Sequence, residues 1–175
     1  GIGPKKGKKI YVECPTTYLA TIQFENNALI QMTLSFDVVD HKRNHIELYG
    51  TKGSIIVTDP NMFGGSVLVC KSTGGNWEEY KTVNMNLGKI NIKNHSGRLN
   101  ESPTNANYRG VGLSEMLYCI ENNKKHRCSS ELSLHVLDII ESLMQAAITK
   151  VPKEIKTTCE RPKYFSEEEV KKILI

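Results

Sequence analysis

The sequence predicts an α+β fold, in which an open, mostly antiparallel β-sheet has helices packed on one of its faces. The first observation is that apolar and polar residues alternate through several short segments of residues 17–83, which is the period of β-strands. The second is that short turns rich in Gly, Asn and Asp separate these segments, so neighbours form antiparallel hairpins. The third is that apolar residues recur every three or four positions in 108–149, as in amphipathic helices.

Three hairpins account for the strands. Asparagines in the first turn tolerate the left-handed conformation, and the second turn is bracketed by Gly50 and Gly53. Trp77, the single tryptophan, is expected to pack against a sheet or helix. The strands are expected at residues 17–24, 29–36, 46–49, 54–58, 66–71 and 77–83.

A polar connection separates the strands from the helices. Residues 84–105 have few apolar side chains and no periodicity, so they form either a mobile excursion or a functional lid. His95 within them is expected at the surface.

Two helices follow this connection. The first is expected over residues 108–121 and the second over about 129–149, and together they are expected to cover one sheet face. A shorter third helix is expected after Ser166, because Ser166 and Glu169 have the spacing of a capping box. The apolar stripe of the first helix is expected to be Leu113, Met116, Leu117 and Ile120.

The chain length suits one main domain with less structured ends. We expect a flexible end at residues 1–9, an α/β domain that binds substrate and oligomerises at residues 10–150, and an extension with a short helix at residues 151–175. An open sheet face invites a partner, so we expect a homo-oligomer.

Composition argues against several classes of protein. The net charge of +4 is mild, and its lysine cluster before residue 10 has no interleaved aromatics, so we expect no nucleic-acid partner. The five cysteines are far apart and never form a C-x-x-C pair, which favours reduced thiols in the cytoplasm over disulfides or zinc. No apolar run reaches about 18 residues and no leader opens the chain, so no membrane partner is expected.

Five side chains are candidates for binding a polar ligand. His41 and Arg43 lie between two strands and can donate hydrogen bonds to hydroxyls or anions, although the segment could equally be a solvated connection. Arg109 and His126 lie at helix entries, from which side chains can reach a cleft; Arg109 could instead tie down the polar loop. His135 lies beside an apolar stripe and is either a hydrogen-bonded core residue or a ligand.

No complete catalytic set is found among these residues. The sequence has no G-x-G-x-x-G motif after a strand, no G-x-S-x-G motif and no H-E-x-x-H motif, so we expect neither a cofactor site nor a metal site in this chain.

Three separated segments resemble one family. Residues 46–65, residues 107–113 (NYRGVGL) and residues 126–137 (HRCSSELSLHVL) are similar to the C-terminal domain of the Gfo/Idh/MocA oxidoreductases, the family of glucose-fructose oxidoreductase and inositol dehydrogenase. The resemblance covers roughly residues 10–150. It implies a parent enzyme that moves hydride between NAD or NADP and a hydroxyl of a sugar or polyol.

The resemblance also implies that the catalytic residues and the substrate-binding residues lie in different parts of the parent enzyme. The lysine of the family's E-K-P motif and its proton-handling aspartate and histidine would lie upstream of the matched segments, with the cofactor domain, so the chain alone is expected to be inactive. His41, Arg43, Arg109, His126 and His135 would then bind substrate, and the sheet would mediate subunit packing. The alternative is a non-catalytic interaction or oligomerisation module.

Overall fold

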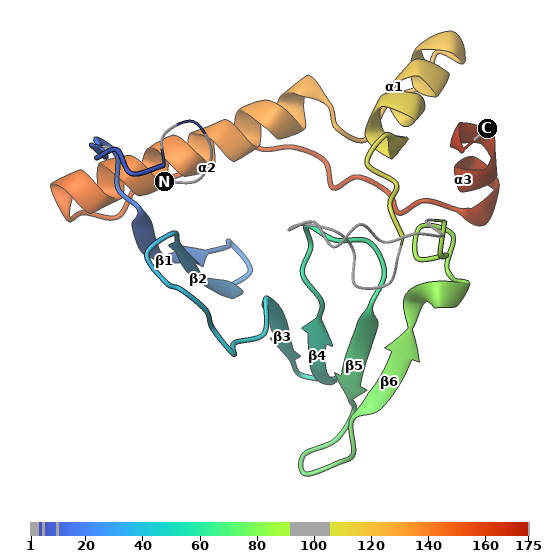
Figure 1. Ribbon diagram of the computed structural model, residues 1–175, viewed down its shortest axis with the longest axis horizontal. Coiled ribbons are helices and arrows are strands. Elements are labelled where there is room, and N and C mark those ends of the chain that lie inside the picture. Colours follow the sequence, from blue (N-terminus) through green and yellow to red (C-terminus); the bar gives the residue numbers. More distant parts are fainter. Residues whose placement is uncertain (1–3, 5, 10, 92–105, 175) are drawn as a thin grey trace. The chain divides into compact units, whose positions relative to one another are not determined.

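The computed structural model describes residues 4, 6–9, 11–91 and 106–174 (Figure 1). These residues form two compact units, residues 1–42 and 43–175, which are described separately. His95 and most of the polar connection lie outside the described residues.

The first unit is a hairpin. Strand β1 (Thr17–Gln23) pairs antiparallel with β2 (Leu29–Ser35), with Ala20 opposite Met32. Asn27 adopts a positive φ of 66° in the turn, as the asparagine-rich sequence predicted.

The second unit contains a four-stranded antiparallel sheet in the order β3-β4-β5-β6. Its tightest turn joins β3 to β4 at Gly53, which has a φ of 148° and where a Cβ would lie 2.5 Å from the carbonyl oxygen of Cys70. The strands are β3 (Ile46–Gly50), β4 (Gly53–Val57), β5 (Ser66–Cys70) and β6 (Glu78–Lys81).

The α+β class and the antiparallel pairing are confirmed, but two details of the sheet differ from expectation. The strands form a two-stranded and a four-stranded sheet instead of one. Trp77 lies outside β6 and is 45% exposed, so its expected burial is wrong. The β5–β6 ladder closes at the pair Val69 and Glu78, which leaves Trp77 in the connecting loop.

A 3₁₀ turn (Thr82–Asn84) follows the strands. The helices among residues 106–174 are α1 (Val111–Glu121), α2 (Ser130–Thr149) and α3 (Glu167–Ile173). Helix α1 begins three residues later than expected, because the carbonyl of Tyr108 accepts a turn hydrogen bond from the amide of Val111. The Ser129 hydroxyl caps α2, and the predicted capping box between Ser166 and Glu169 is confirmed at α3.

The buried face of α1 is not the predicted stripe. Leu113, Leu117 and Ile120 are more than half exposed, whereas Glu115 and Cys119 are buried. The reason is that α1 packs on α3 and that Glu115 is paired with Arg127, which lies just before α2. The buried apolar side chains of the described residues are Ala106, Cys119, Val170 and Ile173.

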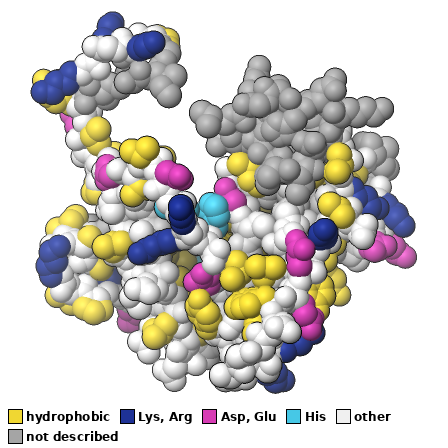
Figure 2. All heavy atoms as spheres, turned by 60° about the horizontal axis from the view of Figure 1, so that its bottom comes forward, with side chains coloured by type: hydrophobic (Ala, Val, Ile, Leu, Met, Phe, Trp, Pro, Cys, Tyr) yellow, Lys and Arg dark blue, Asp and Glu magenta, His cyan; other side chains and the backbone are white. Residues whose placement is uncertain are grey.

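Many large apolar side chains are exposed, and Figure 2 shows patches of them between charged side chains. Within the described part of the second unit, the strongest packing of a helix on another element is that of α1 on α3. The packing of helices on a sheet face therefore stays a prediction.

The segment after α2 runs back along that helix, in orange to red in Figure 1. Oδ2 of Asp138 accepts hydrogen bonds of 2.9 Å from the amides of Lys156 and Thr157 and from the Thr157 hydroxyl. Among the described residues, α2 is one helix that is long and apolar enough to cross a membrane by length and composition alone. In this structure its Asp138 instead holds the returning segment.

Candidate functional site

Of the five side chains that the sequence singled out, His41 belongs to the first unit and the other four to the second, where Arg109, His126 and His135 have different contact partners. His41 and Arg43 are exposed and fall on opposite sides of the boundary between the two units. The backbone amide of His41 donates to Oδ1 of Asp40 at 2.8 Å. A shared site for the two therefore stays a prediction.

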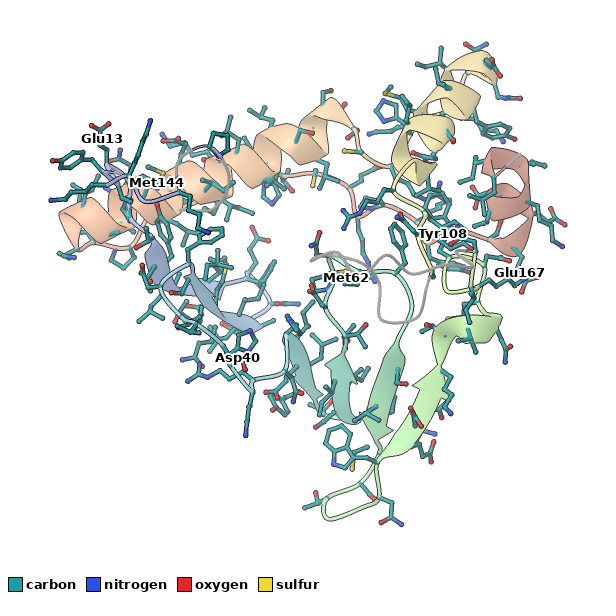
Figure 3. The ribbon with its side chains drawn as sticks, viewed as in Figure 1. Glu13, Asp40, Met62, Tyr108, Met144 and Glu167 are labelled. Carbon is teal, nitrogen blue, oxygen red and sulfur yellow. The ribbon has the colours of Figure 1, made fainter. Side chains whose placement is uncertain are left out.

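Arg109 and Asn61 are the chain neighbours of Tyr108 and Met62, both of which are labelled in Figure 3. The Nη2 atom of Arg109 donates to the carbonyl oxygen of Asn61 at 3.4 Å, which links the segment before α1 to the loop after β4. The rings of Phe63 and Tyr108 meet edge-on beside it, with centroids 5.7 Å apart. Arg109 thus contacts the loop after β4, whereas the sequence offered the polar connection before it as the segment it would tie down; its exposed side chain stays a candidate for substrate binding.

His135 is half-buried on α2, and its Nδ1 lies 3.0 Å from the hydroxyl of Thr157. Thr157 is also held by Asp138 one turn further along α2. This arrangement matches the hydrogen-bonded structural interpretation of His135, because the partner hydroxyl belongs to the returning segment.

His126 is the candidate that lies at a cavity. The cavity has a volume of about 320 Å³ and is lined by side chains from α1, residues 124–129, residues 160–165 and α3. The His126 Nδ1 atom is buried and has no hydrogen-bond partner among the residues that the structure describes. Since buried polar atoms in native proteins are nearly always paired, this nitrogen marks the cavity as a place where a polar group could bind.

Arg127, the next residue, organises the wall of this cavity. Its Nη1 lies 3.0 Å from Oε1 of the buried Glu115, and its Nη2 lies 3.1 Å from both carboxylate oxygens of Glu169. Nε donates to the carbonyl of Lys163 at 2.7 Å, and Nη2 also donates to the carbonyl of Tyr164. The guanidinium of Arg127 therefore joins α1, α3 and the segment just before α3.

Two further contacts fix the same side chain. The Arg127 guanidinium lies over the Phe165 ring, 3.9 Å from its centroid, where the ring quadrupole attracts a cation. The backbone amide of Arg127 donates to both oxygens of Glu115, at 3.0 and 3.2 Å. Both carboxylates of this cluster are thus bound by charge-assisted hydrogen bonds, which are the strong kind.

Electrostatics fixes the protonation of two groups in the cavity wall. Hydrogen bonds from the Ser166 amide and from Arg127 lower the pKa of Glu169 from 4.5 to about 2, so this carboxylate is ionised at neutral pH. Burial, together with the nearby Glu115, raises the pKa of the Cys119 thiol. Cys119 is therefore a protonated packing residue and not a nucleophile.

The lining of this cavity offers hydrogen-bonding and charged groups to a ligand. Arg127 directs its donors at the protein, Glu169 is ionised at neutral pH, and the described residues contain no group of His, Cys, Asp and Glu able to hold a metal ion. His126 offers an open hydrogen-bonding position, and the surrounding lysines and arginines offer positive charge.

The sequence interpretation missed Glu115, Arg127 and Glu169 as members of one cluster. A signal for Glu115 was present, because it stands four residues before Cys119 on a helix that must bury one face. Glu169 was noticed only as the acid of a capping box. Its second partner comes from a residue 42 positions earlier, which local spacing does not show.

Comparison with known proteins gives one match. The model of the "Oxidoreductase family, C-terminal alpha/beta domain" matches residues 6–155, which is most of the chain. The matched range includes β1 to β6, α1 and α2, and ends before Glu160, Lys163 and α3. No curated protein and no solved structure matches the chain.

Proposed function

The chain belongs to the Gfo/Idh/MocA oxidoreductase family as its C-terminal α/β domain, and we propose that it is the substrate-side and oligomerising part of an NAD(P)-dependent dehydrogenase acting on a hydroxyl of a sugar or polyol. The observation that carries this proposal is the family match over residues 6–155. The antiparallel sheets and the helices that follow them agree with an α/β domain of this kind.

The cofactor is assigned to another part of the parent protein. Dinucleotides bind in the crevice of parallel βαβ units, whereas all the strand pairs described here are antiparallel. The residues described therefore do not fit NAD or NADP, and the role proposed for them contains no step on the nicotinamide. When bound elsewhere in the parent, the cofactor would supply the hydride chemistry.

The test of this proposal is a substrate screen on the full-length protein that carries this domain. Polyols and sugars are offered with NAD and with NADP, and reduction of the nicotinamide is followed by its absorbance. Turnover of at least one polyol or sugar with either cofactor is expected. A full-length protein that binds NAD(P) yet oxidises none of them would contradict the dehydrogenase assignment and favour the interaction module.

Arg109 is the residue proposed to orient a substrate oxygen. Its side chain is exposed at the entry of α1, and a guanidinium presents several donors in a fixed plane that suits hydroxyls and anions. Replacing Arg109 with alanine in the full-length enzyme should lower kcat/KM by about tenfold or more, since a hydrogen bond to a charged donor is lost.

A matched control is Lys52→Ala, which removes a cation from the β3–β4 turn. It should leave kcat/KM unchanged. Equal kinetics for Arg109→Ala and Lys52→Ala would remove Arg109 from the substrate site and leave it the loop-tying role alone.

The homo-oligomer is proposed to form through the sheets. Leu19 and Leu29 on the first hairpin are 75% and 66% exposed, which is costly for large apolar side chains unless another surface covers them. Light scattering of the full-length protein at micromolar concentration should give at least a dimeric mass, and Leu19→Ser with Leu29→Ser should lower it. A monomeric mass for the unmodified protein would refute this part of the proposal.

A further inference from the structure

The cavity beside His126 has features of a ligand site that the family match does not account for. Part of its wall, from Glu160 to Ile173, comes from residues beyond the matched range. Its volume of about 320 Å³ is at the lower end of the range for small-molecule sites, about 300–1,000 Å³. His126, whose buried Nδ1 has no hydrogen-bond partner in the described part of the chain, belongs to its lining.

The charges of the lining favour an anion. Five of its side chains are cationic and three are carboxylates, which leaves two uncompensated positive charges before any ligand is bound. A dianion would neutralise the lining, whereas a cation or an apolar molecule would leave the excess charge in place.

The cationic side chains of the lining differ in how many contacts they already make with the protein. The N–H groups of the Arg127 guanidinium already donate hydrogen bonds to Glu115, to Glu169 and to two backbone carbonyls. Arg161 and Lys163, in contrast, make no side-chain hydrogen bond or ion pair with any residue that the structure describes. These two side chains can therefore turn toward a ligand without breaking an existing contact.

We infer that this cavity binds a small dianion of the phosphate monoester class. Arg161 and Lys163 hold the phosphate oxygens by charge-assisted hydrogen bonds, and Nδ1 of His126 pairs with a ligand oxygen. Arg127 acts as the positioning residue, because it fixes the 163–165 segment through two backbone carbonyls and the Phe165 ring. This inference does not depend on the proposed dehydrogenase activity.

The experiment is calorimetric titration of the purified chain with inorganic phosphate and with glycerol 3-phosphate, each at constant ionic strength and with sodium chloride as the reference. Saturable binding of both phosphates is expected, together with a rise in melting temperature as phosphate is added. The double variant Arg161→Gln with Lys163→Gln should weaken binding by about tenfold or more, since two charged donors are lost.

The matched control is Lys153→Gln with Lys156→Gln. It removes two positive charges, as many as the test variant does, from positions in the same extension outside the cavity lining, and it should retain the affinity of the unmodified chain. Equal weakening in both double variants would show a general effect of charge and overturn the site.

A second readout is independent of these variants. The ring nitrogens of His126, assigned in NMR spectra through a His126→Gln variant, should shift when phosphate is added. Those of His135 should not, because its Nδ1 already lies beside Thr157. An unmoved His126 signal, or the absence of saturable phosphate binding, would refute the inference.

Discussion

Two sets of hydrogen bonds connect residues after 150 to the rest of the second unit, and they are built differently. We call them the Asp138 tie and the Arg127 tie after the side chain at the centre of each. Asp138 binds the returning segment through neutral donors, two backbone amides and one hydroxyl. Glu115 and Glu169 bind through one guanidinium, and Glu115 is only 3% exposed. When the Asp138 tie breaks, its polar groups can bond to water instead, so little stability is lost. When the Arg127 tie breaks, the buried carboxylate of Glu115 loses its cationic partner, which is strongly destabilising.

The difference shows which tie determines the structure around the cavity. The Asp138 tie joins α2 to an extended segment, and either part can hydrate its polar groups when they separate. The Arg127 tie joins α1, residues 163–165 and α3 at once. Replacing Arg127 should therefore loosen α1, residues 163–165 and α3, whereas replacing Asp138 should loosen only the segment around residues 156 and 157.

The largest expected effect comes from Arg127→Gln. The substitution leaves the buried Glu115 without its cation and should lower the free energy of unfolding by roughly 3 kcal/mol, the lower end for a broken buried ion pair, because Arg127 itself keeps 21% side-chain exposure. Urea denaturation measures it. Arg161→Gln, an arginine without a described partner, is the control and should change stability little. Equal stabilities for the two variants would contradict the ranking of the ties.

Asp138→Asn should have an intermediate effect. The amide keeps one acceptor oxygen but loses the charge that strengthens three hydrogen bonds, so the melting temperature should fall less than in Arg127→Gln. Glu141→Gln, on the same helix without a described hydrogen bond, is the matched control. A larger loss from Asp138→Asn than from Arg127→Gln would reverse the comparison.

A smaller, pH-dependent effect is expected from Glu169. Its pKa is lowered from 4.5 to about 2, so the stability it contributes is present above pH 4.5 and is lost as the pH falls toward 2. The side chain is 42% exposed, so solvent screening limits the contribution to at most about 1 kcal/mol. Glu169→Gln should flatten the acid limb of the stability curve between these pH values, while Glu168→Gln should leave that limb unchanged.

The smallest expected effect comes from the pair of His135 and Thr157. Either His135→Gln or Thr157→Val should cost less than about 1 kcal/mol, as neutral hydrogen bonds at half-buried positions do. A double-mutant cycle measured by urea denaturation should show coupling between the two positions. Additive losses would mean that their contact does not contribute to stability.

The local parts of the fold could be predicted from the sequence. Period-two alternation located the hairpins, and the spacing of Ser166 and Glu169 located α3 with its cap, because these features depend on neighbours along the chain. Even so, Trp77 and the stripe of α1 were placed wrongly. Burial depends on what packs against a residue, and periodicity does not contain that information.

The candidate site could be predicted only in part. His126 was identified from its place at a helix entry, and it lies in the cavity wall. Arg127 and its two carboxylates were not, because the partners come from positions 12 and 42 residues away in the chain. An ion cluster of this kind, in which Glu115 is the buried member, follows from tertiary contacts, which hydrophobic patterns do not encode.

Amide hydrogen exchange tests most directly whether Arg127 holds the C-terminal helix in the structure. In the unmodified chain the amides of Val170 and Leu174, which bond to Ser166 and Val170, should be protected. In Arg127→Gln their protection should be lost, while that of the β4–β5 ladder is retained. Unprotected α3 amides in the unmodified chain, or equal protection in both proteins, would contradict the account.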